Sequence, residues 1–141
     1  MSKKKRREIP RFETPIIETH CHLDYLEEDE LAAVLERSRD VGIERIVTIA
    51  VSPDNLSTVL GLARSNDNVW ATQGIHPHEA ESFSDDVANA IREGAGNACV
   101  VAIGEIGLDY YYDHADRAVQ REVFEQQLAI AADLDLPVVI H

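Results

Sequence analysis

Residues 16–24 read Ile-Ile-Glu-Thr-His-Cys-His-Leu-Asp, a short apolar pattern followed directly by two histidines. Ile16 and Ile17 are β-branched and apolar, as a buried strand requires. Successive side chains of an extended chain point to opposite sides, so His20 and His22 share one side and Cys21 faces the other. Two neutral imidazoles at this spacing are suited to one Zn, Mn, Fe, Co or Ni ion. The stretch therefore predicts a strand that ends in a metal site, and the alternative is a histidine pair at a polar strand end.

Strand patterns alternate with helical patterns along the rest of the chain. Strands are predicted at 16–20, 46–51, 69–75, 99–103 and 138–140, and the β-branched run at 46–51 is typical of a strand buried on both faces. Helices are predicted at 28–40, 56–63, 85–92 and 116–134, where apolar residues recur at helical spacing. Strands that alternate with helices, without hairpin signals, predict an α/β fold with a parallel sheet.

Length and composition limit the class of protein. The 141 residues are enough for one domain with a sizeable core. No apolar run approaches the roughly 20 residues of a membrane span, and no apolar segment of the secretory type follows the basic N-terminus. Cys21 and Cys99 form no Cys-x-x-Cys pair and indicate no disulfide framework. We therefore expect a cytoplasmic protein that contacts no membrane.

Charge is unevenly distributed along the chain. Six of the 13 basic residues precede Phe12, together with one of the 26 acidic residues, so the formal charge from Phe12 onward is −18. Such an acidic body would not attract nucleic acid unaided. Residues 1–15 are predicted to form a disordered basic leader, with an arm that touches nucleic acid as the alternative.

The candidate site residues share one position, at or just beyond the C-terminal end of a predicted strand. In a parallel sheet these ends lie on one face, where α/β barrels build their active sites. Polar residues that only mark where strands leave the core are the alternative, but they do not explain histidines and a carboxylate gathered on one face. Such a set is suited to one or two divalent cations that activate water and polarise a phosphoryl or carbonyl oxygen. The residues are His20, His22, His76, His78, Glu105 and His141.

Competing chemistries lack their motifs. Gly104-x-x-Gly107 is neither a phosphate-binding loop nor a dinucleotide fingerprint, and no Gly-x-Ser-x-Gly elbow occurs. Cys21 suggests a thiol nucleophile beside the histidines, but strand alternation turns it away from them. A small apolar role is expected for Cys21 instead.

Four segments resemble, in order and spacing, the signatures of the TatD-type metal-dependent deoxyribonucleases of the amidohydrolase superfamily. They are Glu-Thr-His-Cys-His-Leu-Asp at 18–24, Gln-Gly-Ile-His-Pro-His at 73–78, Val-Ala-Ile-Gly-Glu-Ile-Gly-Leu-Asp-Tyr at 101–110 and Leu-Pro-Val-Val-Ile-His at 136–141. The resemblance implies a TIM-type (β/α)8 barrel. It also implies hydrolysis of phosphodiester bonds in DNA with two divalent cations (Mg, Mn or Zn), in several members as a 3′-5′ exonuclease.

The resemblance further implies roles for individual residues. His20 and His22 would bind the first cation, His141 the second, and Glu105 would bridge both as the catalytic carboxylate.

Four other residues match family positions close to the site. His76 and His78 are expected near the substrate rather than as metal ligands. Asp109 and Tyr110 are expected to shape the loop or meet the substrate, with capping of the following helix as the alternative.

The sequence departs from the family in two respects. Glu18 stands where an aspartate is usual, which is expected to have a modest effect. A full barrel needs about 250 residues, so residues 16–141 correspond to its first five strands and four helices, without the later histidine and the aspartate thought to activate water. We therefore expect a truncated N-terminal part that is inactive alone. The alternatives are an amidohydrolase acting on small amides, lactones or esters, and a non-catalytic half-barrel that self-associates or needs a partner chain.

Overall fold

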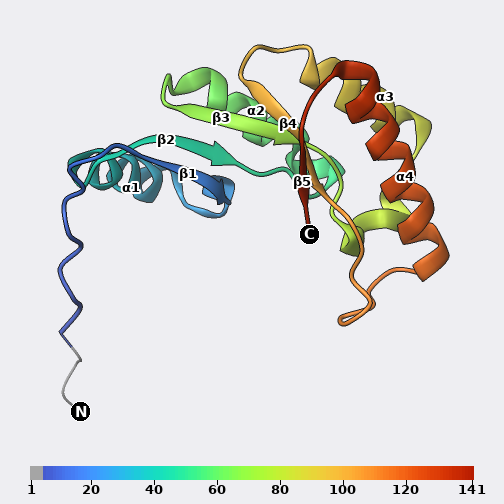
Figure 1. Ribbon diagram of the computed structural model, residues 1–141, viewed down its shortest axis with the longest axis horizontal. Helices are drawn as coiled ribbons and strands as arrows, with labels where there is room; N and C mark the ends of the chain where they lie inside the picture. Colours follow the sequence, from blue (N-terminus) through green and yellow to red (C-terminus); the bar gives the residue numbers. More distant parts are fainter. Residues whose placement is uncertain (1–4) are drawn as a thin grey trace.

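Five parallel strands form one sheet in the computed structural model, which describes residues 5–141. They lie in chain order: β1 (Ile16–Cys21), β2 (Ile43–Thr48), β3 (Val69–Gln73), β4 (Val100–Ile106) and β5 (Val138–Ile140). Four α-helices connect them: α1 (Glu28–Asp40), α2 (Leu56–Ser65), α3 (Asp85–Ala95) and α4 (Arg117–Leu134). Short 3-10 helices η1 (Leu23–Tyr25), η2 (Pro53–Asn55) and η3 (Pro77–Ser82) follow the first three strands. Figure 1 shows this succession along the chain.

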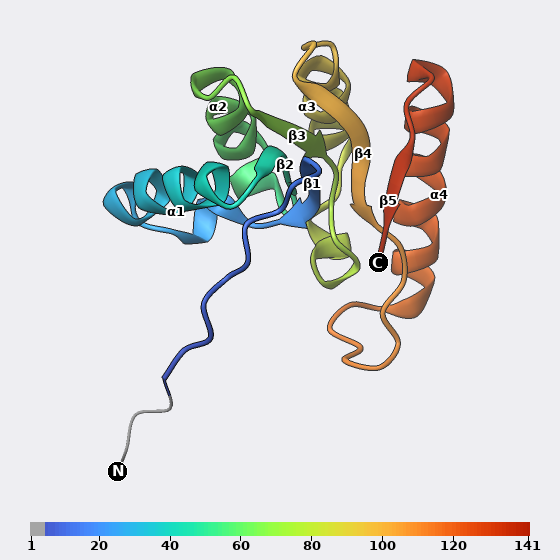
Figure 2. The same cartoon turned by 60° about the vertical axis from the view of Figure 1, so that its left-hand side comes forward.

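The sheet is curled, and the helices lie on its outer side (Figures 1 and 2). Each strand pairs in parallel with the next one in the sequence. Right-handed crossovers between successive neighbours place every helix on the same side of the sheet, whereas a doubly wound sheet reverses direction and carries helices on both faces. The prediction of a TIM-type barrel represented by five strands and four helices is therefore confirmed.

Burial is greatest in the middle of the sheet and least at its two edges. Val59 of α2, Ile91 of α3 and Ile103 of β4 are fully buried in the core. At the edges Ile17 of β1 is 51% exposed and Ile140 of β5 is 54% exposed. The prediction that Ile17 is buried is wrong because β1 has a neighbour on one side only in the described part of the chain.

The second strand begins and ends earlier than predicted, at 43–48 rather than 46–51. The residues at 49–51 leave the ladder, although Ile49 and Ala50 are fully buried. Their backbone groups are used elsewhere: the N–H of Ile49 donates to Cys21, and the carbonyls of Ala50 and Val51 accept from Glu105 and His76. This segment therefore joins the ends of β1 and β4 to the start of η3.

Other boundaries also differ from the predictions. The third strand stops at 73, two residues early, while the fourth extends to 106, so Glu105 lies inside a strand. The third helix continues to Ala95, beyond the predicted end at 92, and it includes Gly94, where the buried side chain of Gln73 takes the place that a Cβ would need. Among residues 5–141, no helix has both the length and the apolar character to cross a bilayer.

The predicted leader lies partly outside the described residues, since the structure begins at residue 5. The described residues up to Arg11 are exposed and form no regular secondary structure. Phe12 already contacts the body, because its N–H donates to the carbonyl of Val41 at 2.8 Å. The disorder of 1–15 stays a prediction.

Candidate metal centre

A cavity of about 290 Å³ opens at the C-terminal ends of the strands. It collects side chains from segments more than 100 residues apart in the sequence, and the four predicted metal ligands are all among them. The lining residues are His20, His22, Tyr25, Val51, His76, His78, Glu79, Glu105 and His141. The structure therefore brings the predicted ligands together, as expected from their position at the strand ends.

Glu105 lies at the centre of this arrangement. Its side chain is only 9% exposed. Its Oε2 lies 3.4 Å from Nε2 of His20, and its Oε1 lies 2.9 Å from Nδ1 of His141. The two oxygens of one carboxylate thus face imidazoles from β1 and from the end of β5. A carboxylate placed in this way is able to contact two ions at once.

The first group of potential ligands consists of His20, His22 and Glu105. Their ligand atoms lie within 4.8 Å of one another. His22 stacks on Tyr25, with ring centroids 5.0 Å apart and 13° between the planes. Its Nδ1 is buried and has no hydrogen-bond partner among the described residues. Tyr25 was missed in the sequence, where nothing but its position three residues after His22 connects it with the site.

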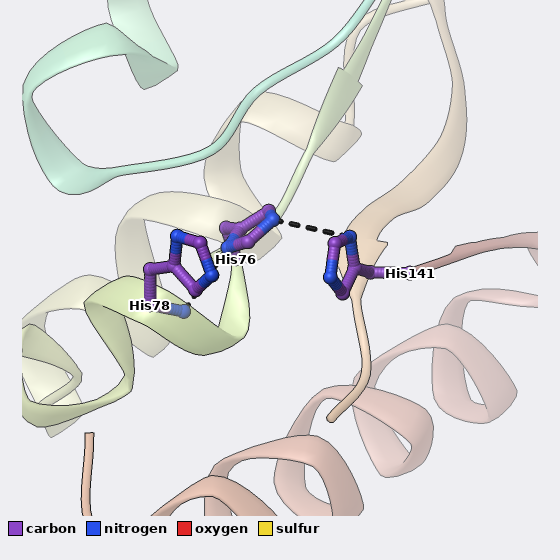
Figure 3. A group of neighbouring side chains, drawn as sticks. All are labelled: His76, His78 and His141. Carbon is purple, nitrogen blue, oxygen red and sulfur yellow. Dashed lines mark hydrogen bonds between the residues drawn. The ribbon is translucent and has the colours of Figure 1, made fainter. Parts of the chain in front are cut away.

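The second group consists of His76, His78 and His141, whose ligand atoms also lie within 4.8 Å of one another (Figure 3). The backbone N–H of His78 donates to Nδ1 of His76 at 3.0 Å, so the proton of a neutral His76 resides on Nε2. This Nε2 lies 3.2 Å from Nδ1 of His141. Burial, followed by the neighbouring His141 and His78, lowers the pKa of His76 to about 4, although Glu105 acts in the opposite direction. His76 is therefore neutral and offers an N–H to this group.

Asp109, in the loop after β4, holds the second group in place through hydrogen bonds. Its Oδ2 accepts from Nε2 of His78 and from Nε2 of His141, each at 2.8 Å, and its Oδ1 accepts from the N–H of Tyr112. The hydrogen bond from Tyr112, together with those from the two histidines, holds the pKa of Asp109 well below its usual range despite burial. Asp109 therefore stays ionised, and it orients the His141 ring so that Nδ1 points to Glu105.

Helix α4 holds the backbone on both sides of this site through two buried glutamines. Gln127 accepts from the N–H of Ile75 at 2.7 Å and donates to its carbonyl at 3.1 Å, directly before His76. Gln120 accepts from the N–H of Asp109 at 2.8 Å and donates to its carbonyl at 3.2 Å. One rigid helix thus positions the segments that carry His76 and Asp109.

The capping alternative for Asp109 and Tyr110 is wrong. The cap of α4 is Asp116, whose Oδ1 accepts from the N–H groups of Ala118 and Val119. Tyr110 is not among the residues that line the cavity; its ring lies beneath the guanidinium of Arg117, 4.7 Å from the ring centroid.

The donor set fits a divalent cation. If Nε2 of His141 donates to Asp109, Nδ1 of the neutral ring presents its lone pair to the N–H of His76 at 3.2 Å and also to an oxygen of Glu105 at 2.9 Å. The contact with Glu105 brings two lone pairs together unless a proton or a cation lies between the atoms. Burial lowers the pKa of His141, but its hydrogen bonds to Asp109 and Glu105 prevail and raise it. A cation would replace this proton, since metal ligands must be deprotonated. Nδ1 of His22, which has no partner within residues 5–141, is a further potential ligand atom beside the same carboxylate.

The thiol of Cys21 is expected to be unreactive at neutral pH. It is half-buried and its Sγ–H donates to the carbonyl of Val47. Burial, followed by the charges of Glu18 and Asp24, raises its pKa to about 11. In a Cys99→Ser variant at pH 8, alkylation of Cys21 by iodoacetamide, followed by mass spectrometry, should be about 100-fold slower than that of free cysteine. Comparable rates would reopen the thiol-nucleophile alternative.

A curled parallel sheet with imidazoles and a carboxylate at its C-terminal strand ends defines an α/β-barrel protein with a candidate metal centre. Residues 17–141 match the family described as TatD related DNase, and the chain belongs to this family.

Individual relatives agree with this membership. The uncharacterized metal-dependent hydrolase YabD of Bacillus subtilis (strain 168) is 34% identical over 127 residues, 89% of this chain and 50% of that protein. The 3′-5′ ssDNA/RNA exonuclease TatD of Cronobacter sakazakii is 38% identical over 113 residues, 80% and 42% of the two chains. YjjV, a TatD homologue from Escherichia coli K12, has a crystal structure that resembles this one with a TM-score of 0.81. The match covers 89% of this chain and 49% of YjjV, and the sequence identity is 34%. The chain spans about half the length of these relatives.

Proposed function

We propose that the chain contributes a two-cation centre that hydrolyses phosphodiester bonds in DNA. The observation that carries this proposal is the position of Glu105, whose Oε2 faces His20 and whose Oε1 faces His141. A shared carboxylate is suited to two ions about 3.5–4 Å apart, the spacing of two-metal phosphodiester hydrolases. Family membership supports the same class of reaction.

Each residue of the proposed centre has its own role. His20 and His22 would hold one cation together with Glu105, and His141 would hold the second with the other oxygen of Glu105. Asp109 keeps the ring of His141 in the orientation that presents Nδ1. When bound, cations of this kind neutralise phosphate charge and make bound water a nucleophile near neutral pH. Mg²⁺, Mn²⁺ and Zn²⁺ are the candidates.

Single-stranded DNA cleaved from its 3′ end is the finer proposal for the substrate. It is supported by the name of the relative from Cronobacter sakazakii, a 3′-5′ ssDNA/RNA exonuclease. The formal charge of −18 from Phe12 onward opposes binding of a polyanion. We therefore expect binding of the phosphodiester backbone to depend on the cations at the centre.

The test is calorimetry with a phosphorothioate-linked thymidine tetranucleotide, which resists hydrolysis. It should bind the 141-residue chain in Mn²⁺ and lose binding when the Mn²⁺ is chelated. A small anilide, the probe for an amidohydrolase, should not compete. Binding that persists without Mn²⁺, no binding at all, or full competition by the anilide would each contradict the proposal.

We also propose that the 141-residue chain has little or no nuclease activity by itself. A barrel closes its sheet edge to edge, and the exposed Ile17 and Ile140 mark two edges of this sheet whose backbone groups lack strand partners in the described part of the chain. His141 directly follows β5, the strand at one of these edges.

A 5′-labelled single strand in Mn²⁺ should therefore stay intact with this chain under conditions in which TatD of Cronobacter sakazakii, a 3′-5′ ssDNA/RNA exonuclease, degrades it. Sedimentation with and without Mn²⁺ should show self-association through the open edges. Turnover by monomers equal to that of the Cronobacter sakazakii TatD would overturn the proposal.

A further inference from the structure

The loop between β4 and α4 carries three consecutive tyrosines, and two of them are unusually exposed. Tyr111 is 88% exposed and Tyr112 is 64% exposed. The loop projects at the same end of the sheet as the C-terminal residue His141 (Figure 2). Adjacent solvent-exposed aromatic rings beside a candidate active site are typical of a surface that binds a ligand.

The exposed rings are continuous with the second imidazole group. Tyr111 and Tyr112 meet edge to face at 4.9 Å, and the Tyr112 ring is parallel to that of His114, with 5° between the planes. His114 in turn meets the edge of His78 at 4.5 Å. A path of aromatic faces therefore leads from the candidate metal centre to the tip of the loop. We call Tyr111, Tyr112 and His114 the aromatic path.

The loop is held at both of its ends. Besides its two bonds to Asp109, Gln120 donates from Nε2 to the carbonyl of Ala115 at 2.9 Å. The N–H of Tyr112 donates to Asp109, which also holds His78 and His141. The rings are thus carried by a fastened loop whose anchor is shared with the site. Such pre-organisation reduces the entropy that a ligand loses on binding.

The neighbouring Tyr110 differs from Tyr111 and Tyr112 because its ring is already covered. Its ring is covered by the guanidinium of Arg117, and its hydroxyl faces Arg121 at 3.4 Å. Arg117 is itself paired with Asp113 at 3.0 Å. The ring of Tyr110 is therefore engaged by arginines of α4, whereas Tyr111 and Tyr112 are the more exposed rings of the loop. The surface that remains offers ring faces.

We propose that Tyr111 and Tyr112 stack on nucleobases of a single-stranded substrate whose phosphodiester lies at the candidate metal centre. This inference rests on the proposed function. Ring stacking suits this acidic protein because it needs no positive charge, and it tolerates any base because every base has a π face. The cations would attract the backbone, and the aromatic path would hold the bases next to the scissile bond.

The experiment compares two phosphorothioate tetranucleotides in Mn²⁺, one with thymine bases and one abasic. Both carry the same backbone charge, so only the first is able to stack. The Tyr111→Ala/Tyr112→Ala double variant should bind the thymine strand about 5- to 100-fold more weakly than the parent chain. Its affinity for the abasic strand should be unchanged. The Tyr111→Phe/Tyr112→Phe variant keeps both rings and should bind the thymine strand like the parent.

The outcomes separate this inference from the function on which it rests. If the parent binds both strands equally in Mn²⁺ and the alanine variant does the same, the phosphodiester site stands and base stacking is overturned. If the parent binds neither strand, the proposed function fails and the stacking inference fails with it. If the phenylalanine variant loses affinity as strongly as the alanine variant, the hydroxyl groups rather than the rings bind the strand. Circular dichroism on each variant identifies any loss of fold.

Discussion

Replacing Glu105 with glutamine is expected to lower the affinity for Mn²⁺ by about 100-fold or more. The amide keeps the shape of the side chain but loses the negative charge and one of the two acceptor oxygens between His20 and His141. Loss of a partner in the outer shell of a metal site already costs about 10- to 100-fold in affinity, and a bridging carboxylate should exceed that. Calorimetric titration with Mn²⁺ measures the effect, and an unchanged circular dichroism spectrum verifies the fold.

Glu79→Gln is the matched control. Glu79 lines the same cavity and is exposed, so this variant removes the same unit charge at a position away from the space between His20 and His141. Its affinity for Mn²⁺ should change little. Equal losses in both variants would show that the total charge of the cavity matters and the bridging position does not. Full affinity in Glu105→Gln would remove Glu105 from the metal centre.

Gly74→Ala is expected to reduce the free energy of unfolding by about 3 kcal/mol, at the upper end of the cost of overpacking. A Cβ at position 74 would lie 2.8–2.9 Å from the N, C and Cα atoms of Gly104. These are backbone atoms of a central strand, and the carbonyl of Gly104 is held by the hydroxyl of Thr72. The strand ends that carry His76 and Glu105 would have to separate, so affinity for Mn²⁺ should also fall. Urea denaturation measures the change.

Gly61→Ala is expected to stabilise the protein, in contrast to Gly74→Ala. Gly61 lies on the exposed side of α2, and nothing is within 4 Å of the position of its Cβ. Alanine in an open helical position should raise the free energy of unfolding by about 0.5–1 kcal/mol. If both variants lost the same stability, the close approach of Gly74 to Gly104 would not be the cause.

The topology and the location of the site could be predicted because both depend on patterns that are local in sequence. Alternating apolar runs specify βαβ units, and polar residues at the strand ends place His20, His22 and His141 on one face. The limits of β2 could not be predicted in this way. An apolar run indicates that residues are buried, but it does not indicate which backbone groups they pair with. Ile49 and Ala50 are buried, yet their backbone groups form hydrogen bonds outside the ladder of β2.

The hydrogen bonds that hold the site residues in place could not be predicted from sequence patterns for a related reason. Gln120 and Gln127 appear as ordinary polar residues of a helix, yet both are buried, and their partners are backbone groups of loops 11 and 52 residues away. Asp109 likewise depends on His78 and His141, which lie 31 and 32 residues away. Such partnerships arise only when the elements have packed.

The order of the strands also has a consequence for biosynthesis. Each new βα unit that leaves the ribosome finds its neighbour already in place, since β2 pairs with β1, β3 with β2, and so on to β5. Strands that are neighbours in the sheet are also neighbours in the sequence, so no pairing has to wait for a strand from a later part of the chain. The nascent sheet therefore is able to grow from its N-terminal edge one strand at a time, and His141, which directly follows β5, joins the site only after Glu105 is in place.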